Sequence, residues 1–126
     1  MSCRVNHIHL ISEDVESAAS FYQKHFGATL HTPAGPHGDV PGIGVSLGDV
    51  EIRIRGPRPT DPTGPGANLH HIGIEVDDLE AFSADLERAG VEFTKKPGLG
   101  AVGTMTAFIK TPDEVLIELE GKPADH

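Results

Sequence analysis

Apolar and polar residues alternate every second position in two segments of the chain, which begin 64 residues apart. In the first segment Ile8 and Leu10 alternate with His7 and His9, and this period is typical of a β-strand. Residues 71–80 match residues 7–16 in the order of their histidine, apolar and acidic positions. The match indicates an internal repeat in which each copy begins with a strand.

Each of these strands is followed by apolar residues at spacings of three and four, which indicate one face of a helix. They are Val15, Ala18, Tyr22 and Phe26 in the first copy, and Leu79, Phe82 and Leu86 in the second. Asp14 and Asp78 precede the two runs and can cap the first turns, whose N–H groups have no partners within the helix. Gly27 and Gly90 follow the runs, where glycine readily adopts the left-handed conformation that ends a helix.

Further alternating segments follow each predicted helix and indicate more strands. They cover about 28–32, 42–47 and 50–55 in the first copy, and about 91–95, 103–110 and 114–120 in the second. Each half is therefore predicted to run strand–helix–strand–strand–strand, an α+β class of fold. Because a half of this size has little core of its own, we expect the two sheets to pair, with the helices outside.

A segment rich in proline and glycine separates the two halves. Residues 56–66 contain four prolines and three glycines, a composition that excludes a helix or a central strand. The predicted organisation is one domain over 1–126, with module one at 1–56, a linker at 57–67, module two at 68–121 and a short tail at 122–126.

Composition and charge exclude several classes of protein. The chain has 126 residues, of which 37% are hydrophobic and 23% charged, enough for one domain with a core and unlike a disordered chain. The formal net charge is −9, and an acidic surface repels phosphate backbones, so nucleic acid is not an expected partner. No apolar run approaches the roughly 20 residues of a transmembrane helix, and no signal-peptide pattern opens the chain. The single cysteine, Cys3, cannot form an internal disulfide and suits a reducing cytoplasm.

Two histidines and a glutamate are the leading candidates for chemistry. His7 and His71 hold the same position in the first strand of the two copies, and Glu118 lies near the end of the last predicted strand, on the face away from the helix. If the repeat brings these strands together, the three side chains form a two-histidine, one-carboxylate metal site. The alternative is that both histidines are ordinary strand residues in hydrogen bonds.

Three segments carry a shared family pattern: 7–27, 70–79 and 111–119. In order and spacing they resemble the vicinal oxygen chelate superfamily, which includes glyoxalases, bleomycin-resistance proteins and ring-cleaving dioxygenases. The resemblance implies two tandem βαβββ modules that form a cupped, mixed, glyoxalase-like sheet around a divalent metal ion. It also implies that His7, His71 and Glu118 are the metal ligands.

Members of this superfamily often take a fourth ligand from the last strand of module one, where the alignment places Arg53. A guanidinium has no lone pair to offer a metal, so we expect three protein ligands and more open coordination positions. Arg53 could instead clamp a substrate carboxylate or phosphonate through two parallel hydrogen bonds. Alternatively, it forms a salt bridge to Glu118 or Glu51, or points outward after a slip of one residue in register.

Other residues on the predicted cup face are candidates for catalysis or substrate binding. His9 and Glu75 could move a proton, or they orient a ligand or meet solvent at the rim of the cup. Thr106 and Phe108 share a face by alternation and are expected to contact substrate. The glycine-rich segment 97–103 is predicted to form a mobile flap over the cup.

The expected function is that of a metal-dependent lyase or isomerase, which chelates a small oxygenated, anionic substrate and stabilises an enolate-like intermediate. Zn, Ni, Co, Mn and Fe(II) all accept these ligands. Alternatives are an Fe(II) ring-cleaving dioxygenase, a thiol transferase of the fosfomycin-resistance type, and a non-catalytic antibiotic-binding protein of the bleomycin-resistance type. The expected partners are a small-molecule substrate and a second copy of the chain in a homodimer, without nucleic acid or membrane, in the cytoplasm. The cup could form within one chain or across two.

Overall fold

The computed structural model describes residues 3–31, 40–100, 103–112 and 115–121. Contacts divide the chain into two units: His7–His70, the first-module unit, and Met1–Asn6 with His71–His126, the second-module unit. The boundaries between the units therefore fall inside two strands, directly before His7 and directly before His71. The predicted tail at 122–126 lies outside the described residues.

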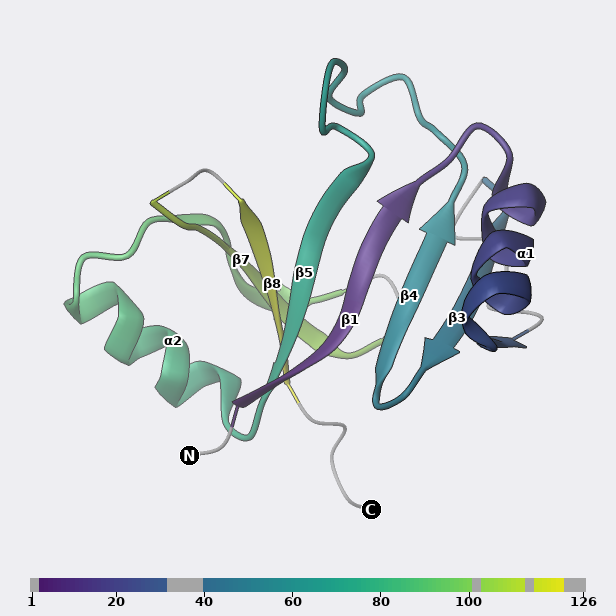
Figure 1. The fold of residues 1–126 in the computed structure, drawn as a ribbon. Helices are drawn as coiled ribbons and strands as arrows, with labels where there is room; N and C mark the ends of the chain where they lie inside the picture. Colours follow the sequence, from purple (N-terminus) through teal and green to yellow (C-terminus); the bar gives the residue numbers. More distant parts are fainter. Residues whose placement is uncertain (1–2, 32–39, 101–102, 113–114, 122–126) are drawn as a thin grey trace. The chain divides into compact units, whose positions relative to one another are not determined.

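The first-module unit is a four-stranded mixed sheet with one helix against it. Its elements are β1 (Cys3–Ile11, from His7 on), α1 (Val15–Phe26), β2 (Thr29–His31), β3 (Gly42–Leu47) and β4 (Val50–Arg55). The strand order is β2-β3-β4-β1, with β1 parallel to β4 and the other pairs antiparallel. Helix α1 packs against β3 and β4 (Figure 1).

The second-module unit repeats this arrangement. Its elements are β5 (Leu69–Val76, from His71 on), α2 (Leu79–Arg88), β6 (Phe93–Leu99), β7 (Met105–Lys110) and β8 (Leu116–Gly121). The strand order is β5-β8-β7-β6, with β5 parallel to β8 and the other pairs antiparallel. Across the described residues the two units hold eight strands and two helices, so the predicted α+β class is confirmed.

Helix α1 begins and ends where the sequence predicts. The Asp14 side chain accepts a hydrogen bond from the Ser17 N–H at 3.0 Å, which satisfies one of the free donors of the first turn. Gly27 follows the helix with a φ of 70°. The buried face carries Val15 and Ala19, which pack against the apolar side of β3 and β4.

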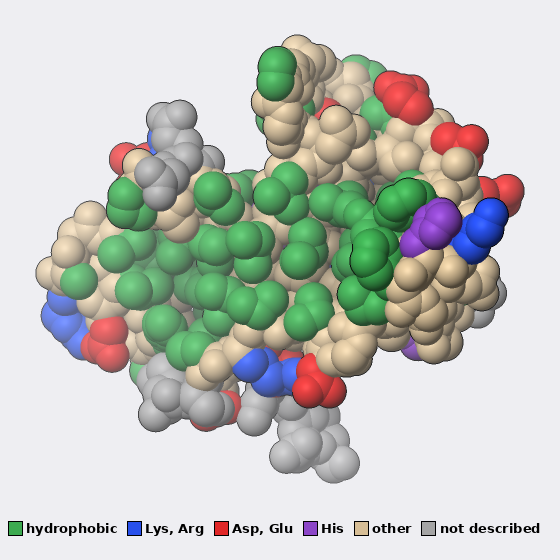
Figure 2. Space-filling view, in the orientation of Figure 1, with side chains coloured by type: hydrophobic (Ala, Val, Ile, Leu, Met, Phe, Trp, Pro, Cys, Tyr) green, Lys and Arg blue, Asp and Glu red, His purple; other side chains and the backbone are tan. Residues whose placement is uncertain are grey.

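Phe26 is a correction to the predicted buried face of α1, because it is 59% exposed. Its ring lies 6.1 Å from that of Phe21 and 6.3 Å from that of Tyr22, centroid to centroid. Phe26 therefore covers aromatic surface of its own helix rather than the sheet. Figure 2 shows hydrophobic side chains at the surface beside α1, with a histidine and a basic side chain next to them.

Helix α2 has the same kind of cap and a separate core. The Asp78 side chain accepts from the Ala81 N–H at 3.1 Å. Leu79 at the start of the helix packs with the buried side chains of the second sheet. These are Val76, Ala107, Ile117 and Leu119. Each unit thus buries its own cluster between one helix and one sheet face, which leaves the opposite sheet face for other side chains.

The predicted flap at 97–103 is wrong for its first three residues. Pro97, Gly98 and Leu99 belong to β6, where Gly98 pairs with Thr106 and Leu99 with Met105. The pairing shifts register between Lys95 and Gly98, and such an irregularity tolerates a proline inside a strand. The sequence rule that proline and glycine end a strand fails here for that reason.

Neither of the two helices in the described residues has the length and apolar character that a membrane crossing requires.

Candidate metal centre

His71 and Glu118 lie together on the sheet face that points away from α2. His71 is 5% exposed and belongs to β5, while Glu118 belongs to the parallel neighbour β8. The distance from His71 Nε2 to Glu118 Oε1 is 3.6 Å. Gly73, which pairs with Glu118, adds no side chain to this face. The structure therefore brings two of the three predicted ligands together.

Phe108 holds the imidazole of His71 from the side. Their ring centroids are 5.4 Å apart and the planes cross at 88°, an edge-to-face contact of the kind that aromatic rings prefer. Phe108 also pairs with Glu118 across β7 and β8. It lines the same face as the candidate ligands, as the alternation of residues predicts.

The chemistry of this pair fits a divalent metal ion. Imidazole nitrogen and carboxylate oxygen are both common ligands, and each bonds zinc at roughly 2.0–2.2 Å. Two such atoms on one ion lie roughly 3.0–3.5 Å apart, from tetrahedral or octahedral angles. The separation of 3.6 Å is near that range and longer than an ordinary N–H···O hydrogen bond. His71 and Glu118 are therefore arranged as two ligands would be.

His7 belongs to the first-module unit. It lies on β1, pairs with Glu51 of β4, and is 0% exposed. A fully buried histidine needs partners for its ring nitrogens, and a metal ion is one such partner. That His7 joins His71 and Glu118 stays a prediction.

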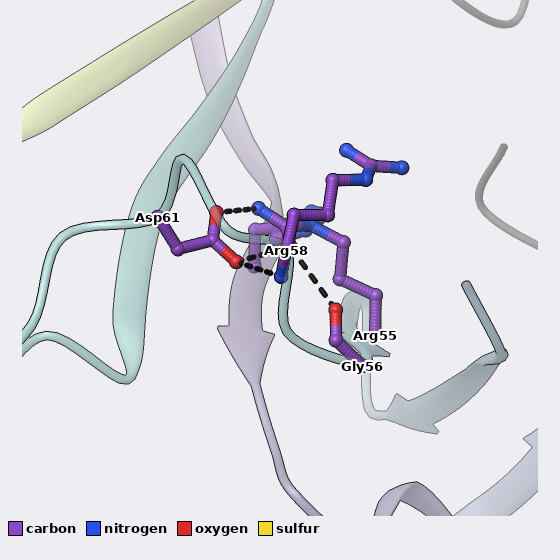
Figure 3. Close-up of polar contacts among 5 residues, drawn as sticks. Arg55, Gly56, Arg58 and Asp61 are labelled. Atoms are coloured by element: carbon purple, nitrogen blue, oxygen red, sulfur yellow. Dashed lines mark hydrogen bonds and ion pairs between the residues drawn. The ribbon is translucent and has the colours of Figure 1, made fainter. Parts of the chain in front are cut away.

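A buried network in the first-module unit involves His9 and two residues that sequence reasoning missed. The Arg55 guanidinium, 4% exposed, makes two parallel bonds to the Asp61 carboxylate at 2.8 and 2.9 Å. Its Nε–H donates to His9 Nε2 at 3.0 Å. Arg55 also donates to the Gly56 carbonyl, and the Arg58 backbone N–H donates to Asp61 at 2.7 Å. Figure 3 shows the Asp61 carboxylate meeting the Arg55 guanidinium and the backbone N–H of Arg58.

This network sets the charge of Asp61 and the tautomer of His9. The hydrogen bonds from Arg55 are the largest cause that holds the pKa of the Asp61 carboxyl well below its usual range. Because Nε2 of His9 accepts a hydrogen bond, the neutral ring carries its proton on Nδ1. In the sequence, Arg55 is only an arginine at the end of a predicted strand, and Asp61 is only an aspartate in the predicted linker. Nothing in their spacing indicates that they pair.

Arg53 forms a salt bridge with one of its predicted partners. Its Nε lies 2.6 Å from Glu51 Oε1 on the same strand, and the two side chains are about one-third exposed. The predicted alternative of a salt bridge to Glu51 is therefore what the structure contains. A role of Arg53 in substrate binding stays a prediction.

Glu75 lies on the same face of β5 as His71 and is partly shielded. Its side chain is 14% exposed and forms an ion pair with Arg4 at 3.3 Å, while Arg4 itself is 60% exposed. The neighbouring strand adds Glu120, which pairs with Glu75 in register and accepts from the Asn6 amide at 3.1 Å. The second-module unit thus gathers several carboxylates on one sheet face.

Gly100 packs so closely against Thr106 that a side chain would not fit. A Cβ at Gly100 would lie 2.8 Å from Thr106 Cγ2 and 3.1 Å from the Thr104 carbonyl oxygen. We expect Gly100→Ala to lower the free energy of unfolding by about 1–3 kcal/mol, the usual cost of overpacking, in urea unfolding. Gly98→Ala is the matched control, because its Cβ would meet Lys95 Nζ at an ordinary 3.6 Å. Equal losses in both variants would contradict the close packing at Gly100.

Comparison with known proteins assigns the family. The family model described as Glyoxalase/Bleomycin resistance protein/Dioxygenase superfamily matches residues 4–119. This chain belongs to that superfamily, as its sequence pattern predicts. The description covers several activities, so on its own it does not separate isomerases from dioxygenases or antibiotic-binding proteins.

The similar curated proteins narrow the class of enzyme. The mitochondrial methylmalonyl-CoA epimerase of Homo sapiens is 32% identical over 93% of this chain and 73% of its own length. The ethylmalonyl-CoA/methylmalonyl-CoA epimerase of Cereibacter sphaeroides is 30% identical over 93% of this chain and 96% of its own. Epimerases are isomerases, and the prediction that this chain is an enzyme of the lyase or isomerase kind is confirmed.

A solved structure agrees at the level of the fold. It is a methylmalonyl-CoA epimerase in complex with methylmalonyl-CoA and NH4+, with a TM-score of 0.76 and 23% identity. The match covers 98% of this chain and 97% of the other. The predicted glyoxalase-like fold is therefore confirmed.

Proposed function

We propose that this chain is a metal-dependent epimerase of 2-carboxyacyl-coenzyme A thioesters of the methylmalonyl-CoA type. The observation that carries the proposal is the similarity to methylmalonyl-CoA epimerases over 93% of the chain. The pair of His71 and Glu118 on one sheet face supports it. The reaction inverts one carbon atom, which lies between the thioester carbonyl and a carboxylate and therefore carries a weakly acidic C–H.

We assign the metal to His7, His71 and Glu118, a two-histidine, one-carboxylate set. The same set accepts Zn, Ni, Co, Mn and Fe(II), so supply and geometry select among them. A divalent ion, when bound, supplies positive charge that stabilises the oxyanion formed next to the carbon that loses its proton. Phe108 keeps the His71 ring in place and offers an apolar surface for the acyl chain.

We assign proton transfer to Glu75. Its carboxylate lies on the same strand face as His71, and its partner Arg4 is largely exposed, so that ion pair is weak and screened by salt. His9 is given a positioning role, because its Nε2 already accepts a hydrogen bond from the buried Arg55. Arg53 and Thr106 are assigned to the substrate-binding site. A homodimer and a cytoplasmic location stay predictions.

The test follows isotope exchange in heavy water. Untagged protein is loaded with one divalent metal at a time and incubated in D2O with methylmalonyl-CoA and, separately, ethylmalonyl-CoA. Deuterium at the inverted carbon is measured by mass spectrometry, against the spontaneous exchange in buffer. We expect exchange well above that background, and a fall of about 10²–10³-fold in Glu118→Gln. Exchange at the background rate with every metal and both thioesters would overturn the proposed function.

A further inference from the structure

Lys95 on β6 is a half-buried cation whose partners are all uncharged. Its Nζ donates to the Thr106 carbonyl at 3.0 Å and to Thr106 Oγ1 at 3.1 Å, with the Gly98 carbonyl at 3.4 Å. In the part of the chain that the structure describes, Lys95 belongs to none of the ion pairs. Carbonyl and hydroxyl dipoles hold an ammonium in place but leave its full positive charge uncompensated.

Strand register puts Lys95 on the same face as the candidate metal ligands. Lys95 pairs with Phe108, and Phe108 pairs with Glu118. Paired residues point to the same side of a sheet and neighbouring strands lie about 4.8 Å apart. The Cα atoms of Lys95 and Glu118 are therefore separated by about 10 Å, two strand spacings. The apolar ring of Phe108 lies between the cation and the ligand pair.

The residues that hold the Lys95 side chain are themselves closely packed. Thr106, which accepts two of its hydrogen bonds, is 4% exposed, and Gly100 packs directly on Thr106. The next residue shows the contrast, because Lys96 is 67% exposed and is paired with Glu87. Only one of these adjacent lysines carries an uncompensated charge, and it does so in a chain whose net charge is −9.

We propose that Lys95, held by Thr106, binds an oxyanion of the substrate while the acyl group lies beside Phe108, towards the divalent ion that His71 and Glu118 would hold. The arrangement of cation, aromatic ring and ligand pair fits a molecule with two polar ends and a short apolar middle. In the proposed substrate class that oxyanion is either the carboxylate of the acyl group or a phosphate of coenzyme A. The inference rests on the proposed function for the identity of the substrate, but the binding of an oxyanion at Lys95 needs no turnover.

The test measures binding of two probes without chemistry. Coenzyme A and malonate are each titrated at low salt into wild type, Lys95→Met, Lys95→Arg and the matched control Lys96→Met, followed by amide NMR signals of residues 95–100 and 104–108. We expect Lys95→Met to raise the dissociation constant of one probe about 10- to 100-fold, the effect of a lost charge-assisted hydrogen bond. Lys95→Arg keeps the charge and is expected to retain most of the binding, and Lys96→Met to match wild type.

The two probes distinguish the source of the oxyanion. A loss confined to coenzyme A assigns a phosphate, and a loss confined to malonate assigns the carboxylate; either supports the inference. Equal dissociation constants for wild type and Lys95→Met with both probes would overturn it. A protein that shows Lys95-dependent binding without isotope exchange would overturn the proposed epimerase and leave the oxyanion site standing.

Discussion

Replacing His71 by alanine is expected to remove the bound divalent metal and most of the isomerase activity while the sheet remains folded. His71 offers a buried imidazole 3.6 Å from the Glu118 carboxylate, so its loss removes one of the proposed ligands and exposes the other to water. Mutation of a residue that only hydrogen-bonds to a metal ligand already lowers metal affinity or activity by about 10- to 100-fold. We expect the loss of a ligand itself to cost more than that. The measurement is metal content by mass spectrometry, on untagged protein purified without chelator, for wild type and variant.

The control for this experiment is His25→Ala. His25 is an exposed histidine on α1 that touches the Phe21 ring, so its loss tests for adventitious binding by surface imidazoles. Because alanine leaves a cavity at the buried His71, Glu118→Gln serves as a nearly isosteric second variant. Wild-type metal content in both His71→Ala and Glu118→Gln would show that the metal lies elsewhere. Wild-type protein that takes up no metal, even after reloading with each ion, would remove the basis for metal-dependent catalysis.

Replacing Arg55 by methionine is expected to lower the free energy of unfolding by about 3–5 kcal/mol, the cost of removing one partner from a buried ion pair. Arg55 is 4% exposed and the Asp61 side chain 10%, so the remaining carboxylate cannot be fully hydrated. His9 also loses the donor to its Nε2. Since small domains are stable by only about 5–15 kcal/mol, this change is a large share of the total. Urea unfolding at neutral pH measures it.

Arg53→Met is the matched control, because it changes the same residue type two positions earlier on the same strand face. Arg53 and its partner Glu51 are about one-third exposed, and pairs of that kind contribute less than about 1 kcal/mol. The double variant of Arg55→Met with Asp61→Leu is expected to recover much of the loss, because it leaves no unpaired charge. Equal losses in Arg55→Met and Arg53→Met would show that the Arg55 network does not stabilise the fold.

Stability at acid pH is expected to depend on the same network. The pKa of Asp61 is lower in the folded chain than in the unfolded chain, where an aspartate titrates near pH 3.9. Its contribution to stability is therefore complete above about pH 4 and is lost as the pH falls below that value. In Arg55→Met the cause of the low pKa is gone, so stability should fall less steeply with acid than in wild type.

Short-range rules account for the parts of the fold that the sequence predicts correctly. Asp14 and Asp78 cap the two helices, because a capping side chain reaches only three residues along the chain. The alternation of residues also places His71 and Glu118 on the sheet face opposite the core, since the period of two assigns every strand residue to one side. The sequence by itself therefore determined the elements, their apolar faces and which side chains share a face.

The tertiary structure decided which of those side chains meet. The sequence offered Arg53 two acidic partners, Glu118 and Glu51, and the structure pairs it with Glu51. Arg55 pairs with Asp61 of the proline-rich segment, and Lys95 donates to Thr106 at an irregular part of the pairing between β6 and β7. Alternation fixes the side of a sheet but not the partner, because the partner depends on register, on the path of connecting loops and on local irregularities. For that reason the shared face of His71 and Glu118 could be predicted from the sequence, whereas the buried arginine network and the uncompensated lysine could not.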